Sequence, residues 1–399
     1  MNMRPQLVGA IWTLLVGIEI GVAATKPDSS LAHGFADATY GSSSNGSATC
    51  VAGLISVPAT SVNTKILLDE PANQTVVTEI IQENFQASST ISDRTDGGNV
   101  NISGTYNIEA TLCVPKHNPE ASTIQILSHG IGLDQSYWDI ATGYSYVDSA
   151  ANAGYATLAY NRLGVGASDH PDAIQVVQAP MDVAILHGIT SLLRSGSIGT
   201  QAYSTVIGTG HSYGSIIQLG QNVKYPQDVN ATVITSFTTN FDYLPYTVFA
   251  NNPAIANQVD GKRFENLSNG YLITDTSISF QLPFFRWPYF DTEIYQNQYE
   301  ARNTYTVGQQ LTLSGIVAVA SSYTGPVSVV VGQYDFPFCG GNCSYSTNQA
   351  AEALSSLYPA AAESSQTYLV PNAGHVINAH YSAPDQFMKI NNFLSSQGF

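Results

Sequence analysis

Short apolar runs alternate with helix-compatible stretches from about residue 124 to the end of the 399-residue chain. The runs are four to six residues long, as is typical of strands buried on both faces of a parallel sheet. Strands that alternate with helices imply βαβ units, and therefore a mostly parallel, doubly wound α/β sheet. The expected strands are 124–127, 156–160, 204–208, 231–236, 327–332 and 367–370, and the expected helices are 136–153, 179–194, 213–224 and 347–358.

The N-terminal part of the chain has a different pattern. Residues 25–49 are rich in Ser, Gly, Ala and Asp without periodicity, which predicts a loose leader, and order is expected to begin near Cys50. Segments such as 76–81 and 101–114 read as alternating strands, with Asp-Gly-Gly at 96–98 as a turn signal. An antiparallel portion of the sheet is therefore expected before the parallel strands.

The alternation is interrupted between residues 241 and 324, where Tyr, Phe, Trp, Asn and Pro are dense and Phe-Phe-Arg-Trp-Pro-Tyr-Phe occupies 284–290. We interpret this stretch as an insertion between the sixth and seventh parallel-type strands, dividing a core of residues 50–240 and 325–399. It would lie over the carboxyl ends of the strands, where open α/β sheets bind ligands. We expect a lid with an aromatic underside; the alternative is that its aromatics only form a small core of its own.

The N-terminus predicts export from the cell. Arg4 precedes an apolar stretch from Leu7 to Ala24 that ends in Val-Ala-Ala, which indicates a cleaved secretory signal over residues 1–24. An uncleaved membrane anchor is the alternative, although Glu19 interrupts the stretch and its length is at the lower limit for spanning. No stable membrane span is expected after cleavage.

Four cysteines and six Asn-x-Ser/Thr acceptors agree with a secreted, extracellular glycoprotein. Cys339 and Cys343 lie so close together in the sequence that a disulfide between them can only be a local one. Cys50 and Cys113 are then the expected second pair, although four cysteines allow three pairings. A metal site is disfavoured because no Cys-x-x-Cys occurs. The acceptors are Asn45, Asn73, Asn101, Asn230, Asn266 and Asn342.

The charge of the chain argues against nucleic acid as a partner. The formal net charge is −16, and the 13 Lys and Arg residues are scattered. Without a basic stripe to hold phosphates, no nucleic-acid binding is expected.

A serine flanked by glycines marks the junction of the strand at 204–208 and the helix at 213–224. A sharp strand-to-helix turn would force Ser212 into a strained backbone conformation, and Cβ atoms at Gly210 and Gly214 would clash. The Gly-x-Ser-x-Gly pattern arises easily by chance, so its place between strand and helix carries the argument. Ser212 is the candidate nucleophile.

A serine hydroxyl attacks a carbonyl only with a base to take its proton and a carboxylate to orient that base. Asp335 follows the expected strand at 327–332, and His375 follows the one at 367–370. The order Ser212, Asp335, His375 is the one that parallel-sheet hydrolases impose. His380 is the alternative base and Asp242 the alternative acid.

With these residues the chain resembles the α/β-hydrolase superfamily over about residues 100–399. Asp-Phe-Pro-Phe-Cys-Gly-Gly-Asn-Cys at 335–343 is similar to secreted fungal members of the serine esterase and lipase type. The resemblance implies the α/β-hydrolase fold, with Ser212 as nucleophile, His375 as general base and acid, and Asp335 as orienting carboxylate.

The resemblance also implies donors for an oxyanion. One is the backbone N–H of Ile131 in Ser-His-Gly-Ile-Gly at 128–132, and the other is the N–H of Tyr213 at the start of a helix. A plain strand-to-helix turn is the alternative for this loop. The Asn-Arg-Leu-Gly-Val-Gly-Ala-Ser run at 161–168 is similar to a structural turn of these hydrolases.

The default activity that the resemblance implies is cleavage of carboxylic esters through an acyl-enzyme. The expected substrate is a small apolar or aromatic ester, and no metal or organic cofactor is required. A lactonase, a C–C bond hydrolase or a peptidase with the same three residues stays open, as does a catalytically silent binding protein on the same fold.

Overall fold

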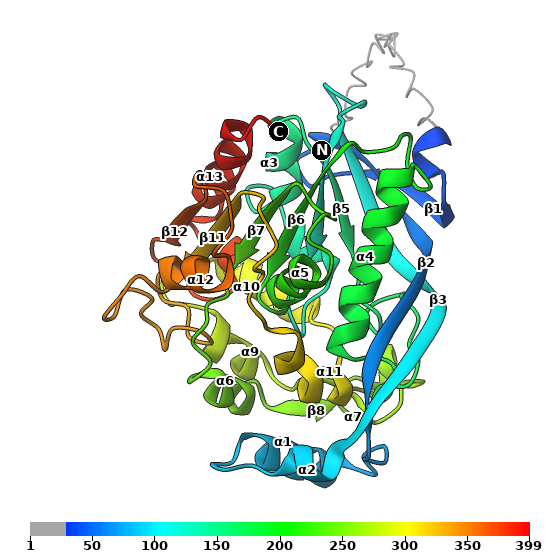
Figure 1. Cartoon of the computed structure of the whole chain (residues 1–399), viewed down its shortest axis with the longest axis vertical. Helices are drawn as coiled ribbons and strands as arrows, with labels where there is room; N and C mark the ends of the chain where they lie inside the picture. Colours follow the sequence, from blue (N-terminus) through cyan, green and yellow to red (C-terminus); the bar gives the residue numbers. More distant parts are fainter. Residues whose placement is uncertain (1–28) are drawn as a thin grey trace, which may run out of the picture.

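The structure is a computed structural model that describes residues 29–399 (Figure 1). The expected signal segment, residues 1–24, lies outside the described residues. In the described part of the chain, every helix is too short or too polar to cross a lipid bilayer.

Six strands of the described chain run parallel to one another, and all six were expected from their apolar runs. The first five in the chain lack polar alternation because both of their faces are buried, whereas the sixth lies at an edge of the sheet and is partly exposed. They are β4 (Thr123–Ser128), β5 (Ala156–Tyr160), β6 (Thr205–His211), β7 (Ala231–Thr235), β11 (Val327–Gly332) and β12 (Gln366–Val370).

Three antiparallel strands complete the sheet: β1 (Phe35–Ser42), β2 (Ala48–Ile66) and β3 (Asp96–Pro115). Within residues 29–399 the order is β1-β2-β3-β5-β4-β6-β7-β11-β12. The predicted α/β sheet, antiparallel in its first part and parallel in the rest, is thus confirmed.

Helices cover both faces of the sheet. Along β11, Val329 and Val331 pack into one core and Val330 into the other, so successive residues of a strand serve opposite faces. Figure 1 shows α4 (Ala179–Ser195) and α5 (Tyr213–Lys224) across the front of the sheet. Their core includes α12 (Gln349–Leu357), and the opposite core includes α3 (Tyr146–Asn152) and α13 (Ala383–Ser396).

The prediction of a loose leader over residues 25–49 was wrong for its described part. β1 pairs with β2 from Phe35 to Ser42, and β2 begins at Ala48. β1 is an edge strand of mostly small and polar residues with little burial, so backbone hydrogen bonds hold it and no hydrophobic pattern marks it.

Residues 76–81 form no strand but lie in α1 (Gln74–Phe85), between β2 and β3. Val77, Ile80 and Ile81 form one buried face at helical spacing, and the side chain of Asn73 caps the helix by accepting the N–H groups of Thr75 and Val76. The expected turn at 96–98 is instead the start of β3, which follows α2 (Ile91–Thr95).

The helix expected over 136–153 is divided. A 3-10 turn, η2 (Gln135–Trp138), precedes α3, and Gly143 with φ 86° lies between them. The side chain of Ser145 accepts the N–H of Asp148 and begins the second helix. A positive φ ends any helical run, so one continuous helix cannot form here.

The interruption at 241–324 is an insertion of short elements between β7 and β11. β7 is the fourth, not the sixth, of the parallel strands in residues 29–399, so the expected strand count was wrong. Figure 1 shows the insertion at the lower end of the sheet, beside α1. Its elements are α6 (Leu244–Asn251), β8 (Pro253–Ile255), α7 (Ala256–Val259), α8 (Gly261–Phe264), β9 (Tyr271–Thr274), α9 (Ser277–Phe284), α10 (Thr292–Glu300), β10 (Tyr305–Thr306), α11 (Val307–Thr312) and η3 (Leu313–Ile316).

The insertion is anchored to α1. The side chain of Gln74 donates to the carbonyl of Pro253 and accepts the N–H of Ile255, at 2.9 Å each. Val77 and Ile80 of α1 share an apolar core with β8 and β9. The segment between β2 and β3, which contains α1, and the insertion therefore pack against each other at one end of the sheet.

Both expected disulfides are present. Cys50 and Cys113 are register partners on β2 and β3, with Cα atoms 4.1 Å apart. Cys339 and Cys343 close a short loop after β11, with Cα atoms 4.9 Å apart.

Candidate active site

Ser212 lies in the turn between β6 and α5. Its backbone is in the left-handed region, with φ 55° and ψ −116°, a strained conformation for serine. A Cβ on Gly210 would clash with the carbonyl oxygen of Gly214, and one on Gly214 would clash with that of Ser128. The turn therefore requires glycine at both positions, as the Gly-x-Ser-x-Gly pattern predicts.

Asp335 and His375 reach Ser212 from the loops after β11 and β12. The Oγ of Ser212 lies 2.8 Å from Nε2 of His375, and Nδ1 of His375 lies 2.7 Å from Oδ2 of Asp335. All three are buried, Asp335 completely and Ser212 to 8% exposure. Because a carboxylate only accepts, Nδ1 carries the hydrogen and Nε2 is free to accept the serine proton.

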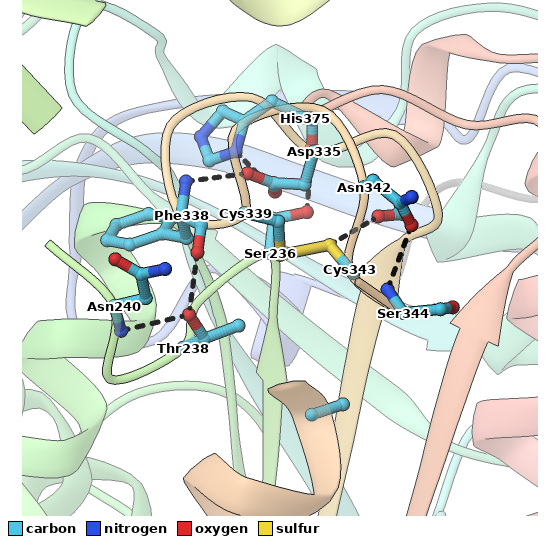
Figure 2. Close-up of a disulfide and its surroundings, with 12 residues drawn as sticks. Ser236, Thr238, Asn240, Asp335, Phe338, Cys339, Asn342, Cys343, Ser344 and His375 are labelled. Carbon is cyan, nitrogen blue, oxygen red and sulfur yellow. Dashed lines mark hydrogen bonds and ion pairs between the residues drawn. A yellow bond between two sulfur atoms is a disulfide. The ribbon is translucent and has the colours of Figure 1, made fainter. Parts of the chain in front are cut away.

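The surrounding backbone holds this chain of hydrogen bonds in place. Figure 2 shows the N–H of Phe338 donating to Oδ1 of Asp335, at 3.0 Å, with the Cys339–Cys343 disulfide in the same loop. Ser236 donates its hydroxyl to the carbonyl of His375 at 2.7 Å. Ser236 was not predicted; its position directly after β7, at a carboxyl strand end, was the available signal.

The two alternative residues lie in other surroundings. Both ring nitrogens of His380 are occupied by backbone groups, and burial lowers the pKa of His380 to about 4. Asp242 is exposed at the start of the insertion, and the carboxylate bound to His375 is that of Asp335.

The loop at 128–132 approaches the serine from β4. Gly130 packs against Ser212, where an added Cβ would come within 3.3 Å of the serine Cβ. Within residues 29–399, the backbone N–H groups of Ile131 and Tyr213 have no hydrogen-bond acceptor. Ile131, Ser212, Tyr213 and His375 line the same cavity. Two free donors are therefore available beside the hydroxyl.

Arg162, from the turn at 161–168, supports that loop from below. Its side chain is fully buried and donates to the carbonyl of Gly130 at 3.2 Å, and its backbone N–H donates to Nε2 of His129. Asp182 lies 3.7 Å from the guanidinium and accepts the hydroxyl of Tyr213 at 2.8 Å. Asp182 was not predicted, because nothing in the sequence of α4 relates it to Arg162.

His211 and His129 are buried beside the site without reaching Ser212. Nδ1 of His211 lies 3.1 Å from the hydroxyl of Tyr137, and the two rings stack at 4.3 Å. Burial, and secondarily the neighbouring His375, lowers the pKa of His211 well below its usual value. Burial and Arg162 do the same for the pKa of His129. Both rings are therefore neutral packing groups.

A cavity of about 370 Å³ opens above Ser212. Phe85 of α1, Val248 of α6, Leu311 of α11 and Phe284 of α9 form its walls, together with Phe338. Asn84, Thr247, Asn251, Gln310 and Ser314 add uncharged polar groups. Among the described residues that line it there is no Asp, Glu, Lys or Arg. The cavity therefore suits an uncharged, largely apolar ligand.

Comparisons with known proteins agree with this fold. The sequence profile of the Alpha/beta hydrolase family matches residues 125–390, and a search of curated proteins found no match. A thermophilic esterase from Thermogutta terrifontis superimposes with a TM-score of 0.50 at 14% identity, over 73% of this chain and 94% of that chain. For the enol-lactonase from Burkholderia xenovorans the values are 0.47, 15%, 73% and 97%. At 14% identity, the likeness to the esterase is one of fold alone.

Proposed function

The chain belongs to the Alpha/beta hydrolase family, and from this premise we propose that it is a secreted serine hydrolase that cleaves carboxylic esters. The hydrogen-bonded chain from Asp335 through His375 to Ser212, at the base of a largely apolar cavity, carries the proposal. Epoxide-opening members of such folds require a carboxylate at the turn, where this chain has Ser212.

In the proposed reaction His375 takes the proton of Ser212 as its Oγ attacks the ester carbonyl. The free N–H groups of Ile131 and Tyr213 would stabilise the oxyanion of the tetrahedral intermediate. His375 then protonates the leaving alcohol. A water molecule next attacks the acyl-enzyme while His375 takes its proton, and His375 finally returns that proton to Oγ of Ser212 as the acid leaves. The carboxylate of Asp335 stabilises the imidazolium that forms in each step.

Two features of the structure support the proposed secretion and glycosylation. All six Asn-x-Ser/Thr asparagines are exposed. The two disulfides are compatible with an extracellular protein, because disulfides persist in oxidising compartments. The resemblance of residues 335–343 to secreted fungal esterases is part of the same proposal.

A fluorophosphonate probe tests the nucleophile. We expect it to label the purified protein stoichiometrically, and Ser212→Ala to abolish labelling, because only a serine activated by a base reacts. Ser314→Ala is the matched control, since Ser314 lines the same cavity without a histidine partner, and it keeps full labelling. Labelling of Ser212→Ala at the wild-type rate contradicts the proposal.

Charged and uncharged esters of equal size test the substrate class. We expect an anionic and a cationic acyl group each to lower kcat/KM by about 100-fold, because an unpaired charge in this cavity loses its hydration. If the net charge of the protein, −16, were the cause instead, it would repel only the anionic ester. Loss with the anion alone therefore contradicts selection by the neutral cavity.

A further inference from the structure

His380 lies at a junction between the loop of His375 and the insertion. It follows η4 (Ile377–Ala379), is fully buried, and has no contact with Ser212 in the proposed reaction. The rings of Phe285 and Phe290 pack against it, at centroid distances of 5.6 and 6.1 Å.

The hydrogen bonds of His380 fix its tautomer and its charge. Nε2 lies 3.0 Å from the N–H of Gly374 and 3.1 Å from that of Arg286, so it accepts from two donors. Nδ1 lies 3.0 Å from the carbonyl of Val376 and must carry the hydrogen. A protonated ring would direct an N–H at two other N–H groups. The arrangement therefore holds only while His380 is neutral.

The two N–H groups belong to segments that meet at the proposed base. Gly374 directly precedes His375, and Arg286 lies two residues after Phe284, whose carbonyl accepts the N–H groups of His375 and Val376 at 2.9 and 3.2 Å. The ring of Phe284 stacks on His375 at 5.3 Å and also forms a wall of the cavity. The two hydrogen bonds that His380 accepts from Gly374 and Arg286, called the joint below, thus fix both the base and a wall of the cavity.

We propose that His380 is a positioning residue that joins the insertion to the loop of His375. It sets the imidazole of His375 against Ser212 and the ring of Phe284 against the substrate. Nε2 of His380 accepts one N–H from its own loop and one from a residue 94 positions away, so a single ring nitrogen links the two segments. The inference rests on the proposed function for its catalytic consequence.

The groups around His380 keep it neutral. Burial and the facing His375 lower the pKa of His380 to about 4. Arg286 faces it with the backbone only, since its guanidinium lies 4.5 Å over a tyrosine ring. On α10, Tyr295 donates its hydroxyl to a backbone carbonyl, and Asp291 accepts the N–H at the start of the helix. The joint is expected to hold at neutral pH and to open as the pH falls toward about 4.

Two substitutions at His380 separate positioning from packing. His380→Leu fills the space but leaves two buried N–H groups unpaired, and we expect kcat to fall about 10-fold to 100-fold with a smaller change in KM. His380→Gln offers a carbonyl oxygen to the same N–H groups and is expected to restore most of kcat. Ile390→Ala, in the same core on α13, is the control for general destabilisation and keeps kcat.

Hydrogen exchange gives a readout that does not depend on catalysis. In the wild type we expect the peptides covering 284–291 and 374–381 to lose protection between about pH 6 and about pH 3.5, beyond the chemical exchange rate. The Gln variant keeps its protection, because an amide does not titrate there. The Leu variant lacks protection at every pH.

Three results would overturn the inference. They are wild-type kcat in His380→Leu, unchanged protection of both peptides in that variant, and no rescue of kcat by His380→Gln. If the wild type cleaves no ester, the proposed function fails, while the exchange experiment still decides whether the joint exists.

Discussion

At the scale of single residues, the site depends on close backbone contacts around Ser212. The carbonyl oxygen of Ser128 lies where a Cβ atom at position 214 would be. Only glycine at that position therefore allows β4 and α5 to approach so closely. The positive φ of Ser212 is possible because its N–H is fixed to the carbonyl of Thr235 at 2.8 Å. The strained turn that directs Ser212 into the cavity is thus held by the neighbouring strand.

Gly214→Ala tests this contact. We expect a loss of about 1–3 kcal/mol in the free energy of unfolding, measured by chemical denaturation, because backbone atoms must move apart. Gly261→Ala is the control, since nothing lies within 4 Å of its added Cβ. Equal stability of the two variants would show that the elbow tolerates a side chain.

At the scale of elements, the loop after β11 is held by its own contacts. The N–H of Gly341 donates to the carbonyl of Asp335, and that of Cys343 to the carbonyl of Gln333. The Cys339–Cys343 bond closes the same loop beside the carboxylate, as Figure 2 shows. We therefore expect the bond to hold Asp335 in position against His375.

Removing each disulfide separates local from global effects. The chain-entropy relation gives about 4 kcal/mol for the 63-residue separation of Cys50 and Cys113, and about 2 kcal/mol for the 4-residue separation of Cys339 and Cys343. We expect the double Ala variant at 339 and 343 to lose turnover with the smaller drop in melting temperature. Unchanged turnover in that variant refutes a role in positioning Asp335.

At the scale of the whole molecule, buried neutral histidines make stability depend on pH. The pKa values of His129, His211 and His380 all lie below the usual 6.5. These three histidines therefore become protonated near pH 6.5 in the unfolded chain, whereas in the folded chain they stay neutral at that pH. The stabilisation is complete above pH 6.5 and is lost progressively as the pH falls.

His380 gives the window for one of these contributions. Its pKa of about 4, against 6.5 when unfolded, corresponds to a loss of about 3 kcal/mol as the pH falls through that range. We expect the stability of the wild type relative to His380→Gln to decrease by this amount, measured by denaturation at each pH. A difference that stays constant from pH 7 to pH 4 contradicts the neutral state of the buried ring.

Much of the sheet and of the site could be predicted because the signals are local. A strand buried on both faces consists mainly of apolar residues, and each of the six parallel strands includes a short, mainly apolar run. Parallel strands all end at one edge, so residues that follow β6, β11 and β12 meet there. Ser212, Asp335 and His375 are brought together for this reason.

The remaining features required the tertiary structure. β1 is held by backbone pairing, and α1 was misread because its apolar residues lie on one helix face whose partner is the distant insertion. Ser236, Asp182 and His380 act through contacts with segments far away in the chain. The sequence by itself determined which local conformations are allowed and in which order the strand ends occur. Only packing decided which polar groups and cavity walls meet, because those contacts join segments that no local pattern relates.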